Sequence, residues 1–566
     1  MEKLKQYYVQ HPLKCILILA FLVRLIAVIF SQGYGFHDDH FLVIEAAQSW
    51  VEKNNWNNWM PWVQKQIDPS VKAVPQGHSL VYAGIHYVLF SVMEFFGLHN
   101  PKGKMFLIRL IHALFSLLIV SFGYKITKHY ISERVAKQVG LILALLWVMP
   151  FISVHNLVEI VCIPFMMWGL WLLIKNEDKE QVFKIYFIAG FIMSLAVSIR
   201  FQTIIVVGGA GLVLLFRKQW KATLAFGIGA ILSFVLLQSV IDYYIWGQPF
   251  AEFVEYVRYN LAAKYGYGKD VWYMYTTVLG GILIPPFSIF LLIGWFMVLR
   301  KHPLLFWPSF LFFAFHNYFP NKQERFILPI LPLFIIAGVI GWWMFMDKSK
   351  FWNQNKKLFK PILVLFWILN LLVLPIFSTT YSKRARCETM VYLGKLDDAN
   401  TVLIDESIRR GVTMFPMFYG GKNMQLYQLD EYIFEDSTTT SLLWQNEREL
   451  YFNTKHLFYG KNITQIYAHD LYDAESFTNF MAPKPLKRHA ENIDTPQDIA
   501  YNNWPEPDYI AFVNENHLDA RIEKMKFYYP EIEHVETVEP SYIDMLMKVI
   551  TPSNNNQLVF IYKVNN

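Results

Sequence analysis

Two adjacent carboxylates are the first residues in this chain that could do chemistry. Asp38 and Asp39 follow the first apolar run and are flanked by His37 and His40. A carboxylate beside a membrane surface can accept a proton from a hydroxyl group or hold a cation. Glu45 follows seven residues after Asp38 and shares its face if this stretch is helical. The alternative interpretation is a solvated loop that carries acidic residues.

A second charged group stands immediately before a later apolar run, in the segment NKQERFILPILPL. It contains Lys322, Glu324 and Arg325. A lysine and an arginine at this depth could bind a phosphate group in the lipid headgroup region. The alternative is an ordinary interfacial anchor, because basic side chains at helix ends commonly extend towards the headgroups.

Further polar residues lie between the apolar runs. Each one alone is more often structural, but ionisable groups at membrane depth are candidates for function. These candidates are His78, Asn156, Glu159, Arg200 and Asp242. Other polar residues lie within apolar runs and are expected to pair with a neighbouring helix, namely Arg24, Arg109 and His112.

The elements that must position these residues are membrane helices. Hydrophobic residues make up 54% of the 566 residues and charged residues only 17%, against about 25% in ordinary soluble proteins. The deficit of charge is confined to the first two thirds of the chain. The sequence therefore predicts an α-helical polytopic membrane domain over residues 1–379 and a soluble α/β domain over 380–566. Short strands are expected in the second domain at TVLIDES, DYIAFVNE and NQLVFIYKV.

A membrane-spanning helix needs about 20 largely apolar residues. Residues 79–97 form an apolar stretch of ambiguous status, so the expected number of spans is 11 or 12. The first run, Cys15–Phe30, follows a basic start and is predicted to be a retained signal-anchor helix. The other candidates are 104–124, 137–153, 158–175, 183–199, 202–216, 222–243, 272–299, 303–319, 325–346 and 360–378.

The distribution of positive charge predicts the orientation, because Lys and Arg accumulate in cytoplasmic loops. Five basic segments can all be placed inside: Lys125–Lys137, Lys175–Lys184, Arg217–Lys221, Arg300–Lys301 and Asp347–Lys360. The acidic first loop (32–78), residues 320–324 and the C-terminal domain then lie on the non-cytoplasmic side. Positive charge is disfavoured there, which favours the phosphate-binding interpretation of Lys322 and Arg325. The net charge is +6, and the sequence contains no long basic block, so no nucleic-acid partner is expected.

Several of these segments together resemble a known family. NKQERFILPILPL is similar to the signature HKE-x-RF-x-x-P-x-x-PL of glycosyltransferase family 22, the lipid-phosphate-mannose-dependent α-mannosyltransferases of N-glycan and GPI-anchor assembly. DDHF at Asp38–Phe41 resembles its acidic motif, and the segment Asp242–Asn260 resembles a third motif. HNLVE and SIRFQT resemble two more, so the resemblance covers about residues 10–346. Three positions depart from the family pattern, Asn321, Asp39 and His78.

The resemblance implies the GT-C architecture, with its active site on the non-cytoplasmic face. It implies transfer of a mannose-like sugar, with inversion, from a polyprenyl-phosphate donor to a glycan or glycolipid acceptor. The membrane would be the bacterial inner membrane or that of the endoplasmic reticulum, and membrane lipids would surround the enzyme. No cofactor is expected, although a metal at Asp38 and Asp39 is possible. The competing classes are a transporter or flippase of lipid-linked glycans and a non-catalytic assembly subunit. Transporters often show repeated halves, and no repeat is visible in this sequence.

Roles follow from the resemblance residue by residue. Asp38 would be the general base, and Asp39 would orient the acceptor. The donor phosphate would be bound by Lys322 and Arg325, with Arg200 or His78 as helpers. Residues expected to shape the site are Glu45, Asn156, Glu159, Asp242, Asn260 and Glu324.

Overall fold

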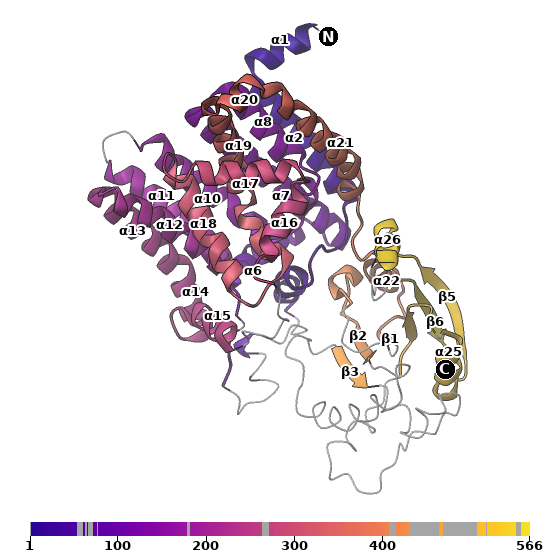
Figure 1. Ribbon diagram of the computed structural model, residues 1–566. Helices are drawn as coiled ribbons and strands as arrows, with labels where there is room; N and C mark the ends of the chain where they lie inside the picture. The colour runs from indigo at the N-terminus through magenta and orange to yellow at the C-terminus, as the bar shows by residue number, and fades with distance from the viewer. Residues whose placement is uncertain are drawn as a thin grey trace. The chain divides into compact units, whose positions relative to one another are not determined.

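The computed structural model describes residues 2–565 (Figure 1). Within this range it leaves out 54–59, 63–64, 66–71, 76, 178–181, 263–270, 407–414, 431–462, 468–505, 517 and 551–555. The chain forms two compact units. The first contains Met1–Asp39, Val74–His86 and Met105–Thr380, and the second contains His40–Ala73, Tyr87–Lys104 and Tyr381–Asn566. The C-terminal part of the second unit thus begins next to the boundary drawn from sequence. The second unit also takes in two earlier segments that the sequence analysis assigned to the membrane domain.

The first unit is built from helices. Its helical elements in chain order are α1 (Glu2–Gln10), α2 (Pro12–Phe30), α3 (His37–Asp39), the start of α6 (Leu80–Phe95), most of α7 (Pro101–Tyr130), α8 (Glu133–Leu145), α9 (Met149–Val154), α10 (Val158–Lys175), α11 (Phe183–Ile199), η2 (Phe201–Thr203), α12 (Ile204–Phe216), α13 (Trp220–Phe234), η3 (Val235–Ser239), α14 (Val240–Trp246), α15 (Ala251–Ala262), α16 (Met274–Ile282), α17 (Phe287–Met297), α18 (Pro303–Tyr318), η4 (Glu324–Ile330), α19 (Leu331–Lys348), α20 (Lys350–Gln354), η5 (Lys356–Leu358) and α21 (Phe359–Ser378).

The number of spans is lower than the sequence predicted. Among the described residues, six helices are long and apolar enough to cross a membrane, and a seventh arises if the bent pair α16 and α17 counts as one span. Other expected spans, including 79–97, 183–199 and 202–216, form apolar helices of 10–17 residues. A helix of 17 residues is only about 26 Å long, against a hydrocarbon core of about 30 Å. By length and composition, the described residues thus give six or seven spans against the 11 or 12 expected, and the shorter apolar helices account for part of the difference.

Glycine residues set the closest helix contacts in this unit. Helices α17 and α19 approach so closely that a Cβ atom on Gly341 would overlap the carbonyl group of Gly294. A Cβ atom on Gly294 would likewise overlap the carbonyl group of Gly338. Small residues at such contacts allow extensive van der Waals packing, which is a main source of helix association in lipid.

The polar residues inside apolar runs link neighbouring helices, as expected. Arg24 in α2 donates from Nε to Oγ of Ser116 at 2.8 Å and from Nη1 to the carbonyl of Ala144 at 3.2 Å. Arg109 in α7 donates to the carbonyl of Val28 at 2.9 Å. Each buried guanidinium therefore satisfies helix carbonyls or a hydroxyl group, as a charge away from water requires.

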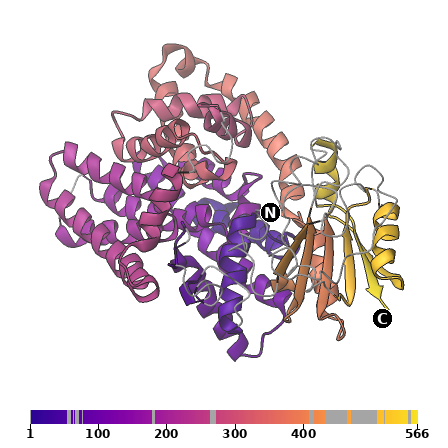
Figure 2. The same ribbon diagram turned by 90° about the horizontal axis from the view of Figure 1, so that it is seen from below.

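The second unit contains one six-stranded sheet, whose strands lie side by side (Figure 1 and Figure 2). The strand order is β3-β2-β1-β4-β6-β5. Strands β3, β2, β1 and β4 are parallel, and β6 pairs antiparallel with β4 and β5. The three strands predicted from sequence are confirmed as β1, β4 and β6. The elements of this part are η1 (His40–Glu45), α4 (Ala46–Val51), α22 (Arg384–Gly394), β1 (Thr401–Glu406), η6 (Met417–Gly420), β2 (Gln425–Asp430), β3 (Ile463–Tyr467), β4 (Tyr509–Val513), α25 (Leu518–Tyr528), β5 (Ile532–Val538), α26 (Tyr542–Ile550) and β6 (Val559–Val564).

Candidate active site

Arg325 lies between the two adjacent carboxylates. Its Nη2 atom donates to Oδ2 of Asp38 at 2.5 Å, and its Nη1 atom donates to Oδ2 of Asp39 at 2.6 Å. The two acids lie on the short helix α3 just after α2, and Arg325 lies on the 3₁₀ segment η4 just before α19. Pro329 and Pro332 stand at the junction of η4 and α19 and favour a tight turn before the regular helix. The planar guanidinium fork can therefore serve two carboxylates at once.

Asp39 is held in place on several sides. Its Oδ1 atom accepts a hydrogen bond from the backbone N–H of Val158 at 3.0 Å, at the start of α10. This bond satisfies one of the N–H groups that have no partner within the helix. The side-chain amide of Asn156 donates to the backbone carbonyl of Asp39. The Asp39 side chain is only 7% exposed, whereas that of Asp38 is 52% exposed. Asp38 is therefore the carboxylate that a substrate can reach.

A third carboxylate and a second guanidinium complete the cluster. Glu159 is fully buried, and its Oε1 atom lies 2.9 Å from Nη1 of Arg200 and 3.7 Å from Nε of Arg325. The cluster thus combines three acids with two guanidinium groups. Within the part of the chain that the structure describes, the buried Nε and Nη2 atoms of Arg200 have no hydrogen-bond acceptor. Two strong donors therefore remain available to an anionic ligand.

The surroundings of the two aspartates move their pKa values in opposite directions. The hydrogen bond from His37 and the positive charge of Arg325 hold the pKa of Asp38 well below its usual range, against a smaller opposing effect of burial. Burial and the negative charge of Glu159 raise the pKa of Asp39 to about 7, although Arg325 opposes this shift. At neutral pH, Asp38 is therefore fully ionised, which a proton acceptor requires.

Aromatic rings flank the guanidinium groups. The Cζ atom of Arg325 lies 5.4 Å from the ring centre of Phe36, and that of Arg200 lies 4.9 Å from the ring centre of Phe326. Such contacts are attractive because the ring face carries negative charge density. They also fix the planes of the two guanidinium groups beside the acids. Sequence reasoning gave neither phenylalanine a role, although Phe326 lies within the segment NKQERFILPILPL and Phe36 begins the segment that contains the two aspartates.

Two other candidates for phosphate binding have different surroundings. The Nζ atom of Lys322 is largely buried and donates to the carbonyl of Phe319 at 2.6 Å. Burial lowers the pKa of His78 to about 4, while the charge of Asp38 acts weakly in the opposite direction. His78 is therefore uncharged at neutral pH and can offer a hydrogen bond but no positive charge.

Four expected shaping residues form no hydrogen bond or ion pair with this cluster in the described part of the chain. Asp242 accepts hydrogen bonds from the side chain of Gln238 at 2.7 Å and from the backbone N–H of Glu252 at 3.1 Å. Asn260 donates within α15 to the carbonyl of Tyr256, and Glu324 is exposed at the start of η4. No hydrogen bond or ion pair among the described residues joins these three to Arg325. The fourth, Glu45, belongs to the second unit.

A buried polar network around Glu252 was missed by the sequence reasoning. The Glu252 carboxylate accepts hydrogen bonds from the backbone N–H of Leu80, from Gln238 and from the indole of Trp246. Burial and the nearby charge of Asp242 raise the pKa of Glu252 well above its usual value. The sequence did contain a signal, because Glu252 is an acidic residue in the first turn of an amphipathic helix. The network joins α15 to the start of α6. Asp242 accepts hydrogen bonds within this network, so its role is structural.

The fold defines a class of architecture: a polytopic helical membrane scaffold of the GT-C type. The crystal structure of ArnT from Cupriavidus metallidurans bound to undecaprenyl phosphate is similar over 97% of this chain and 97% of that chain, with a TM-score of 0.53 and 12% sequence identity. The same protein in the apo state gives a TM-score of 0.54. At this identity the likeness concerns the fold.

The family is shown by sequence. Residues 15–411 match the Alg9-like mannosyltransferase family, and the chain belongs to it. The alpha-1,2-mannosyltransferase ALG9 of Homo sapiens is 26% identical over 145 residues, which are 23% of this chain and 24% of that protein. The probable Dol-P-Man:Man(7)GlcNAc(2)-PP-Dol alpha-1,6-mannosyltransferase of Schizosaccharomyces pombe is 25% identical over 201 residues, 35% of each chain. The chain thus matches about a quarter to a third of the length of these relatives. The resemblance drawn from the motifs is confirmed at the level of the family.

Proposed function

We propose that this protein is a membrane glycosyltransferase that moves a mannose-like sugar from a polyprenyl-phosphate donor to a hydroxyl group of a glycan or glycolipid acceptor. The observation that carries the proposal is the position of an exposed carboxylate, Asp38, on Arg325, in a cluster that also holds the buried guanidinium group of Arg200. A base next to fixed positive charge is what sugar transfer from a lipid phosphate needs. Membership of the mannosyltransferase family supports the same reaction.

Asp38 is the general base in this proposal. Its Oδ2 atom is held by Arg325, and its Oδ1 atom lies 3.5 Å from Nδ1 of His37 on the exposed side. The carboxylate takes the proton of the acceptor hydroxyl while the acceptor oxygen attacks the anomeric carbon. The bond from that carbon to the phosphate oxygen breaks, and the phosphate leaves with the electron pair. A single displacement of this kind inverts the anomeric carbon. Asp39 positions Arg325 and thereby Asp38.

The leaving phosphate needs fixed donors, because negative charge grows on its bridging oxygen in the transition state. The unpaired Nε and Nη2 atoms of Arg200 are the best-placed donors. Arg325 contributes through its charge, since two of its nitrogens already serve Asp38 and Asp39. Lys322 adds a further positive charge from the segment that leads into η4. This division of roles makes Arg200 more important than the sequence alone indicated.

The proposed reaction requires neither a metal nor an organic cofactor. Arg325 already supplies the positive charge between Asp38 and Asp39. A divalent ion at the same place would have to displace a guanidinium group that makes two short charged hydrogen bonds. We also propose that the site faces the non-cytoplasmic side of the bacterial inner membrane or of the endoplasmic reticulum. The support for this is the clustering of Lys and Arg in the loops assigned to the opposite side.

Mass spectrometry of lipid-linked glycans tests the proposal. Cells that lack the protein are complemented with the wild type or with Asp38→Asn, and the lipid-linked glycans are compared. We expect a glycan that is one hexose shorter in the variant and in the cells without the protein. Full-length glycans with an altered distribution between the two leaflets would instead identify a flippase and would overturn the proposal.

A further inference from the structure

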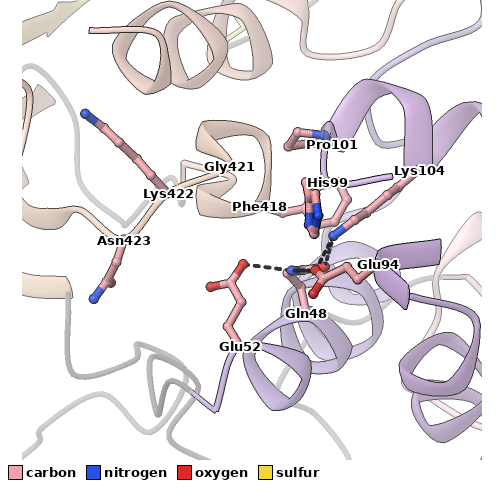
Figure 3. Close-up of a pocket in the computed structure, with 10 residues that line it drawn as sticks. All are labelled: Gln48, Glu52, Glu94, His99, Pro101, Lys104, Phe418, Gly421, Lys422 and Asn423. Carbon is pink, nitrogen blue, oxygen red and sulfur yellow. Dashed lines mark hydrogen bonds and ion pairs between the residues drawn. The ribbon is translucent and has the colours of Figure 1, made fainter. Parts of the chain in front are cut away.

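The second unit contains a polar pocket of about 390 Å³ (Figure 3). This volume lies within the range of about 300–1,000 Å³ that is usual for small-molecule sites. One wall comes from residues near the N-terminus, in and after α4 and at the junction of α6 and α7. The other wall comes from η6 and the residues just after it. The lining residues that matter below are Gln48, Glu52, Glu94, Lys104, Phe418 and Asn423.

A continuous hydrogen-bond network forms one wall. Lys104 is only 2% exposed, and its Nζ atom donates to Glu94 at 2.6 Å and to Gln48 at 2.9 Å. The Gln48 amide in turn donates to Glu52 at 2.7 Å and to Glu94 at 2.9 Å. Figure 3 shows this row of joined side chains on one side of the pocket. A buried lysine thus orients two carboxylates and an amide towards one space.

The charges of the pocket favour a neutral ligand. Lys104 is already paired with Glu94, and the Nζ atom of the other lining lysine, Lys422, donates to the carbonyl of Leu396. Two lysines and two glutamates line the pocket, so its formal charge is balanced. A phosphate would have to compete with the Glu94 carboxylate for Lys104, and it would meet the negative charges of Glu52 and Glu94 in the same space. The carboxylates, by contrast, can accept further hydrogen bonds from hydroxyl groups.

The opposite wall is fixed before any ligand binds. Both carboxylate oxygens of Glu45 accept the backbone N–H of Phe418 at 3.0 Å, and the Phe418 ring stacks on Phe90 with 5.5 Å between ring centres. The Glu45 carboxylate also lies 3.1 Å from Nε2 of His40. A rigid wall lowers the entropic cost of binding. Glu45 therefore acts as a positioning residue for this pocket.

We infer that this pocket is a saccharide-binding subsite. It combines oriented hydroxyl acceptors, balanced charge, an aromatic residue and a rigid wall, which together suit a neutral sugar rich in hydroxyl groups. The assignment of that sugar to the acceptor glycan rests on the proposed function, whereas saccharide binding itself does not. The pocket would give the C-terminal part of the chain a role in holding the acceptor.

Binding of α-linked mannobiose to the purified full-length protein in detergent tests the inference. Saturation-transfer NMR is recorded for the wild type, for Glu52→Ala and Asn423→Ala, and for the control Glu523→Gln. Glu52 and Asn423 are exposed residues of the pocket, and Glu523 is an exposed glutamate of α25, so all three variants should fold. We expect the dissociation constant to rise at least tenfold in both pocket variants and to stay unchanged in the control. Unchanged binding in both pocket variants, or competition by inorganic phosphate at the pocket, would overturn the inference.

Measurements of binding and of sugar transfer on the same protein distinguish failure of this inference from failure of the proposed function. Asp38→Asn should bind mannobiose as the wild type does while losing sugar transfer. If mannobiose binds through Glu52 but the wild type transfers no sugar, the pocket is a saccharide site and the proposed reaction is wrong. If transfer proceeds and Glu52→Ala keeps the wild-type KM for the acceptor, the proposed reaction stands and the pocket is not an acceptor subsite.

Discussion

The Nη1 atom of Arg325 lies 2.6 Å from Oδ2 of Asp39, although 286 positions separate the two residues in the chain. The two side chains are only 10% and 7% exposed. A buried ion pair of this kind adds little net stability, but removal of one partner leaves an uncompensated charge. The pair joins the turn after α2 to the segment before α19, and it thereby fixes the position of Asp38.

Replacement of Arg325 should damage both activity and stability. Arg325→Ala leaves two adjacent carboxylates without their counterion, which costs about 3–5 kcal/mol for a buried pair. We expect a loss of turnover of at least about 100-fold and a lower Tm in detergent. Arg325→Lys keeps the charge but cannot donate along two parallel directions, so it should recover stability better than turnover. Arg258→Ala removes an exposed arginine of α15 and is the matched control. Wild-type turnover in Arg325→Ala would remove this residue from the site.

Replacement of Asp38 should affect the reaction more than the fold. General-base catalysis typically contributes about 10²–10⁴-fold to a rate. We therefore expect Asp38→Asn to lower kcat by that factor in proteoliposomes supplied with a polyprenyl-phosphate sugar. The KM for the donor should change little, because the proposed mechanism assigns the phosphate to Arg200 and Lys322. The Tm should fall less than in Arg325→Ala, because the Asp38 side chain is half exposed and Arg325 keeps its ion pair with Asp39. A near-normal kcat would show that Asp38 is not the base.

The titration of Asp39 should be visible in the pH dependence of stability. The pKa of Asp39 is raised to about 7 by burial and by the charge of Glu159, against about 3.9 in an unfolded chain. Between these values the folded protein binds more protons at this residue than the unfolded chain does. Its contribution to the free energy of unfolding therefore falls as the pH rises from about 4 to about 7, by at most about 1.4 kcal/mol per pH unit.

The measurement is the difference in Tm between the wild type and Asp39→Asn from pH 4 to pH 8. We expect the wild type to lose stability relative to the variant across this window and the difference to level off above pH 7. Asp38 does not interfere, because its pKa is lowered and its stabilising contribution is lost only at pH values below about 4. A difference in Tm that is independent of pH would show that Asp39 is already ionised at pH 4.

The sequence was sufficient to assign Asp38, Asp39, Glu159 and Arg200 to the same side of the membrane as Arg325, but not to separate them from Asp242 and Asn260 or to predict how they are paired. Asp38, Asp39, Glu159 and Arg200 all stand at ends of apolar runs assigned to one side of the membrane, so their proximity follows from topology. Their contacts depend on the short segments α3 and η4, whose geometry no hydrophobic period encodes. Burial and the charge of Glu159 raise the pKa of Asp39, whereas His37 and Arg325 lower that of Asp38, and neither set of neighbours can be read from the sequence.

Glu45 shows a second limit of sequence reasoning. Glu45 was expected to share the face of Asp38 if this stretch is helical, and residues His40–Glu45 form a π-helical turn, in which the hydrogen bonds run from i to i+5. The carboxylate of Glu45 instead binds the backbone of Phe418, 373 positions away. Long-range bonds to a backbone N–H leave no pattern in a single sequence. Helix length is a further limit, since hydropathy detects apolar runs more reliably than it measures the length of the helix, and several expected spans are helices of 10–17 residues.

Packing of α19 should control the site from a distance, because η4, which carries Arg325, leads directly into α19. A Cβ atom on Gly341 would overlap the backbone of α17 at Gly294, so Gly341→Ala should push the two helices apart. Overpacking of this kind typically costs about 1–3 kcal/mol. We expect a lower Tm and reduced turnover for Gly341→Ala. Gly280→Ala in α16 is the matched control, because no atom lies within 4 Å of its new Cβ atom and alanine favours a helix more than glycine does. An equal loss of stability in both variants would show that the close approach of α17 and α19 has no special importance.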